Sequence, residues 1–159
     1  MTSIVIADYQ NADHQRALMS LLNGYATSKE GGGKSLTAYV QENLLSRLQQ
    51  YPGAFSILAF VNDNPAGLVN CFETLSTFSC KSLINIHDVV THSDYRRQGI
   101  ASSMLDKVAE IATSRGCCKL TLEVLEGNIA AREAYLKLGF KAYQLDPELG
   151  QAMFWEKSL

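Results

Sequence analysis

Residues 83–124 constrain the fold more than any other part of the sequence. A run rich in β-branched side chains at 83–91 predicts a strand. Residues 99–115 follow with apolar side chains at helical spacing and a stop at Gly116, and residues 119–124 predict a second strand. Strands that precede and follow a long helix are typical of a mixed sheet with helices on its faces, so we expect an α/β fold.

The flanking sequence continues this alternation. Strands are expected at residues 3–7, 55–61 and 66–75, and again from Phe140 and over 152–157. Helices are expected at 12–24, from a Ser35 cap to Pro52, and from an Asn128 cap to Leu138. The turn at residues 62–65 predicts a hairpin. No linker or repeat interrupts the pattern, which predicts a single domain over residues 1–159.

Composition excludes several classes of function. The 159 residues carry 14 basic and 16 acidic side chains, a formal net charge of −2, whereas a general nucleic-acid binder needs a basic surface. An apolar fraction of 47% is too high for a disordered chain. The sequence shows neither a secretory signal nor a membrane-spanning run, so we expect a cytoplasmic protein without a membrane partner. The four cysteines form no CxxC pair and are expected to be free and mostly buried, with no metal bound.

Residues 96–101, Arg-Arg-Gln-Gly-Ile-Ala, are the candidate binding segment, because they join a strand to the best helix. Gly99 and Ala101 leave the backbone bare at a helix N-terminus, where free N–H groups and the helix dipole favour a phosphate group. The segment lacks the lysine of a P-loop and does not fit GxGxxG, so neither nucleotide hydrolysis nor a Rossmann dinucleotide site is indicated. The simplest alternative is a helix-starting turn with two solvated arginines.

The pattern Arg96-x-x-Gly99-x-Ala101 resembles the (R/Q)xxGx(G/A) motif of the GNAT superfamily of acyl-CoA-dependent N-acetyltransferases. The strands at 84–91 and 120–124, Asn128, Tyr135 and the sequence Leu-Gly-Phe at 138–140 stand at the spacing that the family shows. The resemblance implies a mixed twisted sheet of six or seven strands with about four helices, and a fourth and fifth strand that splay apart. It also implies acetyl-CoA as co-substrate.

Coenzyme A contacts follow from the same resemblance. The strand residues Val89, Val90 and Thr91 are expected to bind pantetheine through the main chain. The loop residues expected to bind pyrophosphate are Arg96, Arg97, Gln98, Gly99, Ile100, Ala101 and Ser102. Asn128 is expected to contact the pantetheine arm, and Tyr135 its sulfur. A bulge in the strand would turn an amide toward the thioester carbonyl as an oxyanion donor. Arg97 departs from the family, which most often has glycine there.

Two catalytic roles are expected. Tyr135 stands where the family has the proton donor to the leaving thiolate; the alternative is a core aromatic residue, with Asn128 as a simple helix cap. His87 stands where several relatives carry a glutamate that acts as base, and an imidazole exchanges protons near neutral pH. The alternative for His87 is a buried side chain bonded to the backbone. Asp88 should point to the other face of the strand by the period-two rule and support structure.

The acceptor is less defined by the sequence. A mobile glycine-rich lid between the first two helices is expected to cover it, and the alternative is a plain flexible connection. The candidate contacts are Tyr25, Glu30, Gly32 and Gly33, with Tyr39 and residues 76–79 nearby. Phe154 and Trp155 are expected in the core or in a homodimer contact. The predicted function is acetyl transfer from acetyl-CoA to a primary amine, small molecule or peptide, by direct attack in a ternary complex. The alternatives are a coenzyme A binding or sensing module without turnover and a phosphate-binding interaction domain.

Overall fold

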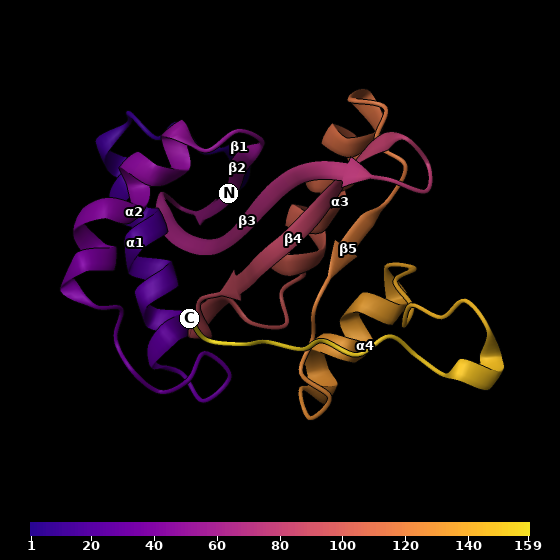
Figure 1. The fold of residues 1–159 in the computed structure, drawn as a ribbon. Coiled ribbons are helices and arrows are strands. Elements are labelled where there is room, and N and C mark those ends of the chain that lie inside the picture. The colour runs from indigo at the N-terminus through magenta and orange to yellow at the C-terminus, as the bar shows by residue number, and fades with distance from the viewer. The chain divides into compact units, whose positions relative to one another are not determined.

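A computed structural model describes all residues from 1 to 159, and the chain divides into two compact units, Met1–Leu122 and Glu123–Leu159. The first unit is built on one mixed sheet in the order β1-β2-β3-β4-β5. Neighbouring strands are antiparallel except for the parallel pair β4 and β5 (Figure 1). The strands are β1 Thr2–Ile6, β2 Ala54–Val61, β3 Asn64–Ser76, β4 Lys81–Thr91 and β5 Leu120–Leu122.

Three helices pack on the two faces of this sheet (Figure 1). Helices α1, Ala12–Thr27, and α2, Ala38–Gln50, lie on one face, where Leu18 and Leu48 join Leu68 of β3 in one buried cluster. Helix α3, Ile100–Ser114, lies on the other face and packs against β2, β3 and β4. The cap of α2 is Thr37 rather than Ser35, because the Thr37 hydroxyl accepts from the Val40 amide.

The hairpin between β2 and β3 forms as the sequence predicts. Its two central residues, Asn62 and Asp63, have φ of 48° and 64°. Positive φ at both positions is the geometry of a type I′ turn, which Asn and Asp tolerate better than other non-glycine residues. The turn places Val61 opposite Asn64 and Phe60 opposite Pro65, and an irregularity at Ala66 shifts the register by one residue from Ala59 onward.

Strand β4 contains a β-bulge. Asp88 pairs with Asn70 of β3, but Ile86 pairs with the next residue, Cys71, so His87 is an extra residue on β4. The expected bulge is thus confirmed, two positions before Val89. Because the extra residue shifts the alternation of faces, the period-two rule fails between His87 and Asp88.

The parallel pair is short. Only Ile84, Asn85 and Ile86 of β4 pair with β5, and from His87 onward β4 has no partner on that edge. The expected separation of the fourth and fifth strands is therefore present. Strand β5 covers three residues, Leu120–Leu122, instead of the predicted 119–124.

The second unit, Glu123–Leu159, contains helix α4, Ile129–Lys137, and a short 3-10 helix η2, Pro147–Leu149. The expected strands from Phe140 and over 152–157 are not formed, so the sheet has five strands rather than six or seven. The Ala152 amide donates to the Tyr143 carbonyl across these segments, but the two segments do not form the ladder of hydrogen bonds that a strand needs. Phe154 and Trp155 are exposed, so their expected place in the core is wrong.

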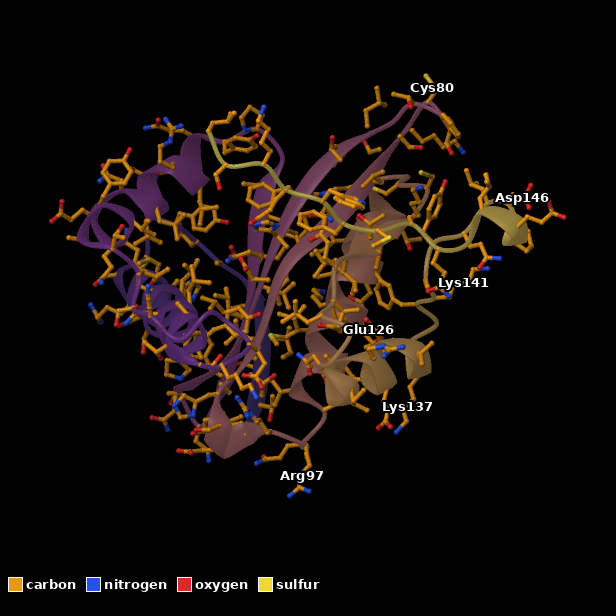
Figure 2. All side chains as sticks on the ribbon, turned by 60° about the horizontal axis from the view of Figure 1, so that its bottom comes forward. Cys80, Arg97, Glu126, Lys137, Lys141 and Asp146 are labelled. Carbon is orange, nitrogen blue, oxygen red and sulfur yellow. The ribbon has the colours of Figure 1, made fainter.

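All four cysteines are free, as expected, but they are not mostly buried. Only Cys71, in the middle of β3, is buried, while Cys117 is half-buried and Cys80 and Cys118 are exposed. Cys80 lies at the tip of the hairpin between β3 and β4 (Figure 2). The apolar pattern of a strand identifies a buried cysteine, whereas a cysteine in a loop gives no such signal.

Candidate functional site

The loop before α3 is built to leave its backbone open. A short 3-10 helix, η1 Ser93–Tyr95, follows β4. The loop between η1 and α3 contains two residues with positive φ, Arg97 at 60° and Gly99 at 79°. The N–H groups from Arg97 to Ser102 donate to no acceptor within the protein. These consecutive free amides at a helix N-terminus fit a polyphosphate, because each can donate a hydrogen bond and the helix dipole adds positive potential.

The side chains of this loop do not cover its free backbone amides. A Cβ atom added to Gly99 would meet nothing within 4 Å, so the space above the backbone is open. Arg97 extends away from the fold (Figure 2), and the Gln98 side chain donates back to the Asp94 carbonyl at 3.0 Å. Buried Ile100 fixes the helix N-terminus against the sheet. The Ile100 side chain therefore anchors the start of α3, while the backbone amides of the loop stay exposed.

The edge of β4 next to this loop is open as well. Val89 and Val90 pair with β3 on one side, and Thr91 ends the same ladder opposite Gly67. Because β5 pairs only with Ile84–Ile86, the other edge of Val89 to Thr91 has backbone groups available to an extended ligand. This arrangement is compatible with the predicted main-chain contacts to a pantetheine arm.

His87 is exposed and lines an open apolar pocket. Its ring lies edge-on against Phe72, with centroids 5.6 Å apart and an interplanar angle of 78°. The imidazole makes no hydrogen bond, so the alternative of a buried, backbone-bonded side chain is wrong. The pocket has a volume of about 390 Å³ and is lined by Leu44, Arg47, Leu48, Tyr51, Phe72 and His87.

Asp88 lies on the same face of the sheet as His87, contrary to the period-two expectation. Its Oδ2 accepts from the Asn70 side-chain amide at 2.9 Å, and Asn70 follows Leu68 on the face that α1 covers. The bulge is the physical reason, because the extra residue brings two consecutive side chains to one face. Reasoning from the sequence missed Asp88 as a site residue, and only the strand pairing could have revealed it.

Two of the predicted acceptor residues, Tyr25 and Glu30, lie within electrostatic range of this face. Burial raises the pKa of the Tyr25 hydroxyl, and the negative charges of Asp88 and Glu30 raise it further. The Glu30 backbone amide holds the pKa of that residue's carboxyl below its ordinary value, and the charges of Arg96 and Lys29 act in the same direction. The structure therefore brings the end of α1, the bulge of β4 and the loop before α3 into one neighbourhood.

The glycine-rich connection is folded back on the end of α1. The amides of Gly31 and Gly33 donate to the Ser28 carbonyl, and the Lys34 amide donates to the Ala26 carbonyl. Gly31 has no room for a side chain against the Tyr25 carbonyl, whereas Gly32 and Gly33 are exposed with φ of 103° and 74°. This connection is an ordered turn whose outer residues face solvent.

The remaining predicted acceptor residues are not part of this neighbourhood. Tyr39 is 71% exposed at the start of α2. Ser76 ends β3, and residues 77–79 belong to the turn between β3 and β4, at the opposite end of β4 from Val89 and Thr91. The polar composition of that turn does not by itself indicate a binding role, because connecting segments lie at the surface in any fold.

Asn128 and Tyr135 belong to the second unit. Asn128 caps α4 by accepting from the Ala131 amide at 3.3 Å, which confirms its expected capping role. Tyr135 is half-buried, and its ring contacts Phe140 at a centroid distance of 5.9 Å. The two residues stand about two helical turns apart, so they share one side of α4.

Side chains that could bind a metal ion are dispersed over the chain. No group of three or more His, Cys, Asp or Glu side chains is arranged to hold a metal ion. None of the helices combines the length and the apolar character that a membrane crossing requires.

Comparisons with known proteins agree with this geometry. The model of the acetyltransferase (GNAT) family matches residues 16–140. The thialysine N-epsilon-acetyltransferase of Bos taurus is 43% identical over 56 residues, which are 35% of this chain and only 33% of that protein. The Caenorhabditis elegans protein of the same name is 27% identical over 123 residues, 77% of this chain and 74% of that one.

A solved structure of an aminoglycoside acetyltransferase from an uncultured soil metagenomic sample, in complex with trehalose, has the same fold. It superposes with a TM-score of 0.80 at 16% identity and covers 99% of this chain and 96% of its own. The family match extends over most of the sequence, including the loop before α3 and the bulged strand. The chain therefore belongs to the GNAT family of acetyltransferases.

Proposed function

We propose that this acetyltransferase moves the acetyl group of acetyl-CoA to the nitrogen of a primary amine by direct attack in a ternary complex. The observation that carries the proposal is the run of free backbone amides from Arg97 to Ser102, which suits the pyrophosphate of coenzyme A. The open edge of β4 from Val89 to Thr91 supports it, since an extended pantetheine arm needs main-chain partners. Residues 1–159 are proposed to act as a single N-acetyltransferase domain.

Each step is assigned to residues of this chain. His87 accepts a proton from the ammonium form of the amine, and the nitrogen lone pair that this frees forms the C–N bond. The nitrogen then loses one further proton to solvent and becomes the neutral amide nitrogen. A backbone amide at the His87 bulge donates to the carbonyl oxygen and stabilises the negative charge that develops there. As the C–S bond breaks, its electron pair stays on sulfur, and the Tyr135 hydroxyl donates a proton to that thiolate. Asn128 contacts the pantetheine arm.

The acceptor is proposed to be a small-molecule or peptide amine. Some of the matching relatives are named for thialysine and one, in Trypanosoma brucei brucei, for glucosamine 6-phosphate. Both names denote compounds that carry a primary amine. Tyr25 and Glu30 are the proposed acceptor contacts, because they lie near the bulged part of β4.

The binding half of the proposal is tested with two matched variants of α3. Gly99 and Gly116 stand just outside the two ends of this helix, with φ of 79° and 70°, and a Cβ atom at either position would have no neighbour within 4 Å. An alanine at either place costs about 1 kcal/mol of backbone strain. Acetyl-CoA should raise the melting temperature of the wild type and of Gly116→Ala alike. Gly99→Ala should lose most of this stabilisation.

The catalytic half is tested by thiol release from acetyl-CoA with a panel of amines that includes thialysine, lysine, glucosamine 6-phosphate, polyamines, aminoglycosides and peptide N-termini. Tyr135→Phe should lower kcat at least about tenfold with acetyl-CoA binding retained. A fully active Tyr135→Phe variant would remove this residue from its assigned role. Binding of acetyl-CoA without thiol release from any amine would instead favour a coenzyme A binding module.

A further inference from the structure

A chain of polar side chains crosses the interior of the sheet. The Tyr9 hydroxyl and Ser56 Oγ are 2.8 Å apart, Ser56 Oγ donates to Asn70 Oδ1 at 2.6 Å, and Asn70 Nδ2 donates to Asp88 Oδ2 at 2.9 Å. Ser56 is 0% exposed and Asn70 is 4% exposed. We call this set, Tyr9, Ser56, Asn70 and Asp88, the polar chain. Apolar residues surround it in β2 and β3, so its polar groups are buried at a cost that only full hydrogen bonding offsets.

The donors of the polar chain all point toward Asp88. Ser56 has a single hydrogen, which it donates to Asn70, so in the contact with Tyr9 the phenol must be the donor. Asn70 accepts from Ser56 through oxygen and therefore presents its NH₂ group to Asp88. If the Asn70 amide were reversed, its oxygen would face the carboxylate oxygen. An ionised Asp88 thus fixes the direction of every bond in the polar chain.

Asp88 has no cationic partner inside the protein. The ion pairs of the structure involve Asp13, Glu73, Asp94 and Glu110, and Asp88 takes part in none of them. Its side chain is half-buried, next to the exposed His87 and within electrostatic range of Tyr25. The Asp88 carboxylate is thus oriented by the Asn70 amide and is not paired with a cation of the protein. Such a carboxylate is complementary to a ligand cation.

We propose that Asp88 binds the ammonium group of the acceptor and that Tyr9, Ser56 and Asn70 are positioning residues which hold its carboxylate toward that group. The inference rests on the proposed function and specifies its substrate class as an aliphatic amine that is cationic when it binds. His87, adjacent on the same face, then receives the proton that the bound ammonium group gives up. The apolar pocket beside His87 accommodates the organic part of such an amine.

Binding is tested first, because it does not depend on turnover. Wild-type enzyme saturated with coenzyme A is titrated with n-propylamine, n-pentylamine and 2-phenylethylamine, and with the alcohols of the same carbon skeletons, by calorimetry or thermal shift. At least one amine should bind more tightly than its alcohol. Asp88→Asn, which keeps the shape and removes the charge, should weaken that amine about a hundredfold and leave the alcohols unchanged.

The positioning role is tested with two buried serines of the same sheet. Ser56→Ala breaks the polar chain, whereas Ser76→Ala removes the hydroxyl that accepts from the Ser79 amide at the far end of β3. Ser56→Ala and Tyr9→Phe should each weaken amine binding severalfold without changing the affinity for acetyl-CoA. Ser76→Ala should change neither. Ser56→Thr, which retains a hydroxyl, should restore part of the amine affinity.

The outcomes separate this inference from the proposed function. Equal binding of amines by the wild type and Asp88→Asn, or no preference for any amine over its alcohol, would overturn the ammonium site. Equal effects of Ser56→Ala and Ser76→Ala on amine affinity would overturn the positioning role. Asp88-dependent amine binding without thiol release from any amine would leave the ammonium site in place and overturn the transferase function.

Discussion

Strand β4 has two halves that differ in their pairing and in their chemistry. From Lys81 to Ile86 it pairs with β3 on one edge, and Ile84, Asn85 and Ile86 also pair with β5 on the other. From Asp88 to Thr91 it pairs with β3 alone. The bulge at His87 marks the boundary. The doubly paired half holds the fold together, and the singly paired half carries the candidate site.

The difference shows how one strand can serve both purposes. Backbone groups that pair on both edges cannot contact a ligand, and buried side chains such as Ile84 and Ile86 cannot reach one. Past the bulge, one edge is free and two consecutive side chains, His87 and Asp88, come to the same face. We therefore expect substitutions in the first half to change stability and substitutions in the second half to change activity.

The largest effect is expected from Ile86→Ala, in the doubly paired half. Ile86 is 1% exposed, and the cavity left by truncation should lower the free energy of unfolding by about 2–5 kcal/mol. Chemical denaturation measures this loss, and kcat per folded molecule should stay near the wild-type value. A strong loss of kcat in fully folded protein would contradict the division of β4 into two halves.

His87→Ala should lower activity strongly and stability only slightly, the reverse of Ile86→Ala. Loss of the proposed base should lower kcat about a hundredfold, which corresponds to about 2.7 kcal/mol of activation free energy. Stability should fall by at most about 1.5 kcal/mol, because an exposed ring loses only its edge-on contact with Phe72. Steady-state kinetics and denaturation of the same preparation compare the two numbers. Unchanged kcat at saturating substrates would remove His87 from catalysis.

The Cys71 thiol can serve as a probe of stability in the doubly paired half of β4, since Cys71 pairs with Ile86. Burial raises the pKa of its thiol from an ordinary 9.0 to about 12. The folded state therefore favours the neutral thiol, and this contribution to stability is fully present below pH 9 and is lost as the pH rises through about 12. Denaturation midpoints of wild type and Cys71→Ala should converge over that interval.

The same thiol should resist alkylation. Cys80 and Cys118 are exposed, so iodoacetamide at pH 8 should modify them at least about a hundredfold faster than Cys71, which reacts only after local opening. Mass spectrometry of a time course gives the three rates. Rapid modification of Cys71 in folded protein would show that this half of the sheet opens readily.

The smallest effect is expected from Arg97→Gly, in the loop that follows the singly paired half. Arg97 has a φ of 60°, a conformation that glycine adopts without strain. The substitution should raise the free energy of unfolding by up to about 1 kcal/mol and preserve acetyl-CoA binding, because the backbone amide remains. A large loss of acetyl-CoA affinity would show that the Arg97 side chain itself binds phosphate.

The sequence predicted the elements with strong local signals. The apolar stripe of α3, the Asn62-Asp63 turn and the Asn128 cap all follow from interactions between near neighbours, and the structure contains each of them. The strands expected from Phe140 and over 152–157 were wrong, because an alternating pattern does not supply the partner that a strand requires. Ser35 was mistaken for the cap that Thr37 forms two residues later.

The sequence by itself determined the phosphate-compatible loop, because glycine and small residues at a helix N-terminus expose amides whatever the rest of the fold does. A formal charge of −2 does not oppose this, since backbone amides carry no formal charge. Only the tertiary structure decided the face of Asp88 and the existence of the polar chain. Both depend on the register between strands, which brings Tyr9, Ser56, Asn70 and Asp88 together from separate parts of the sequence.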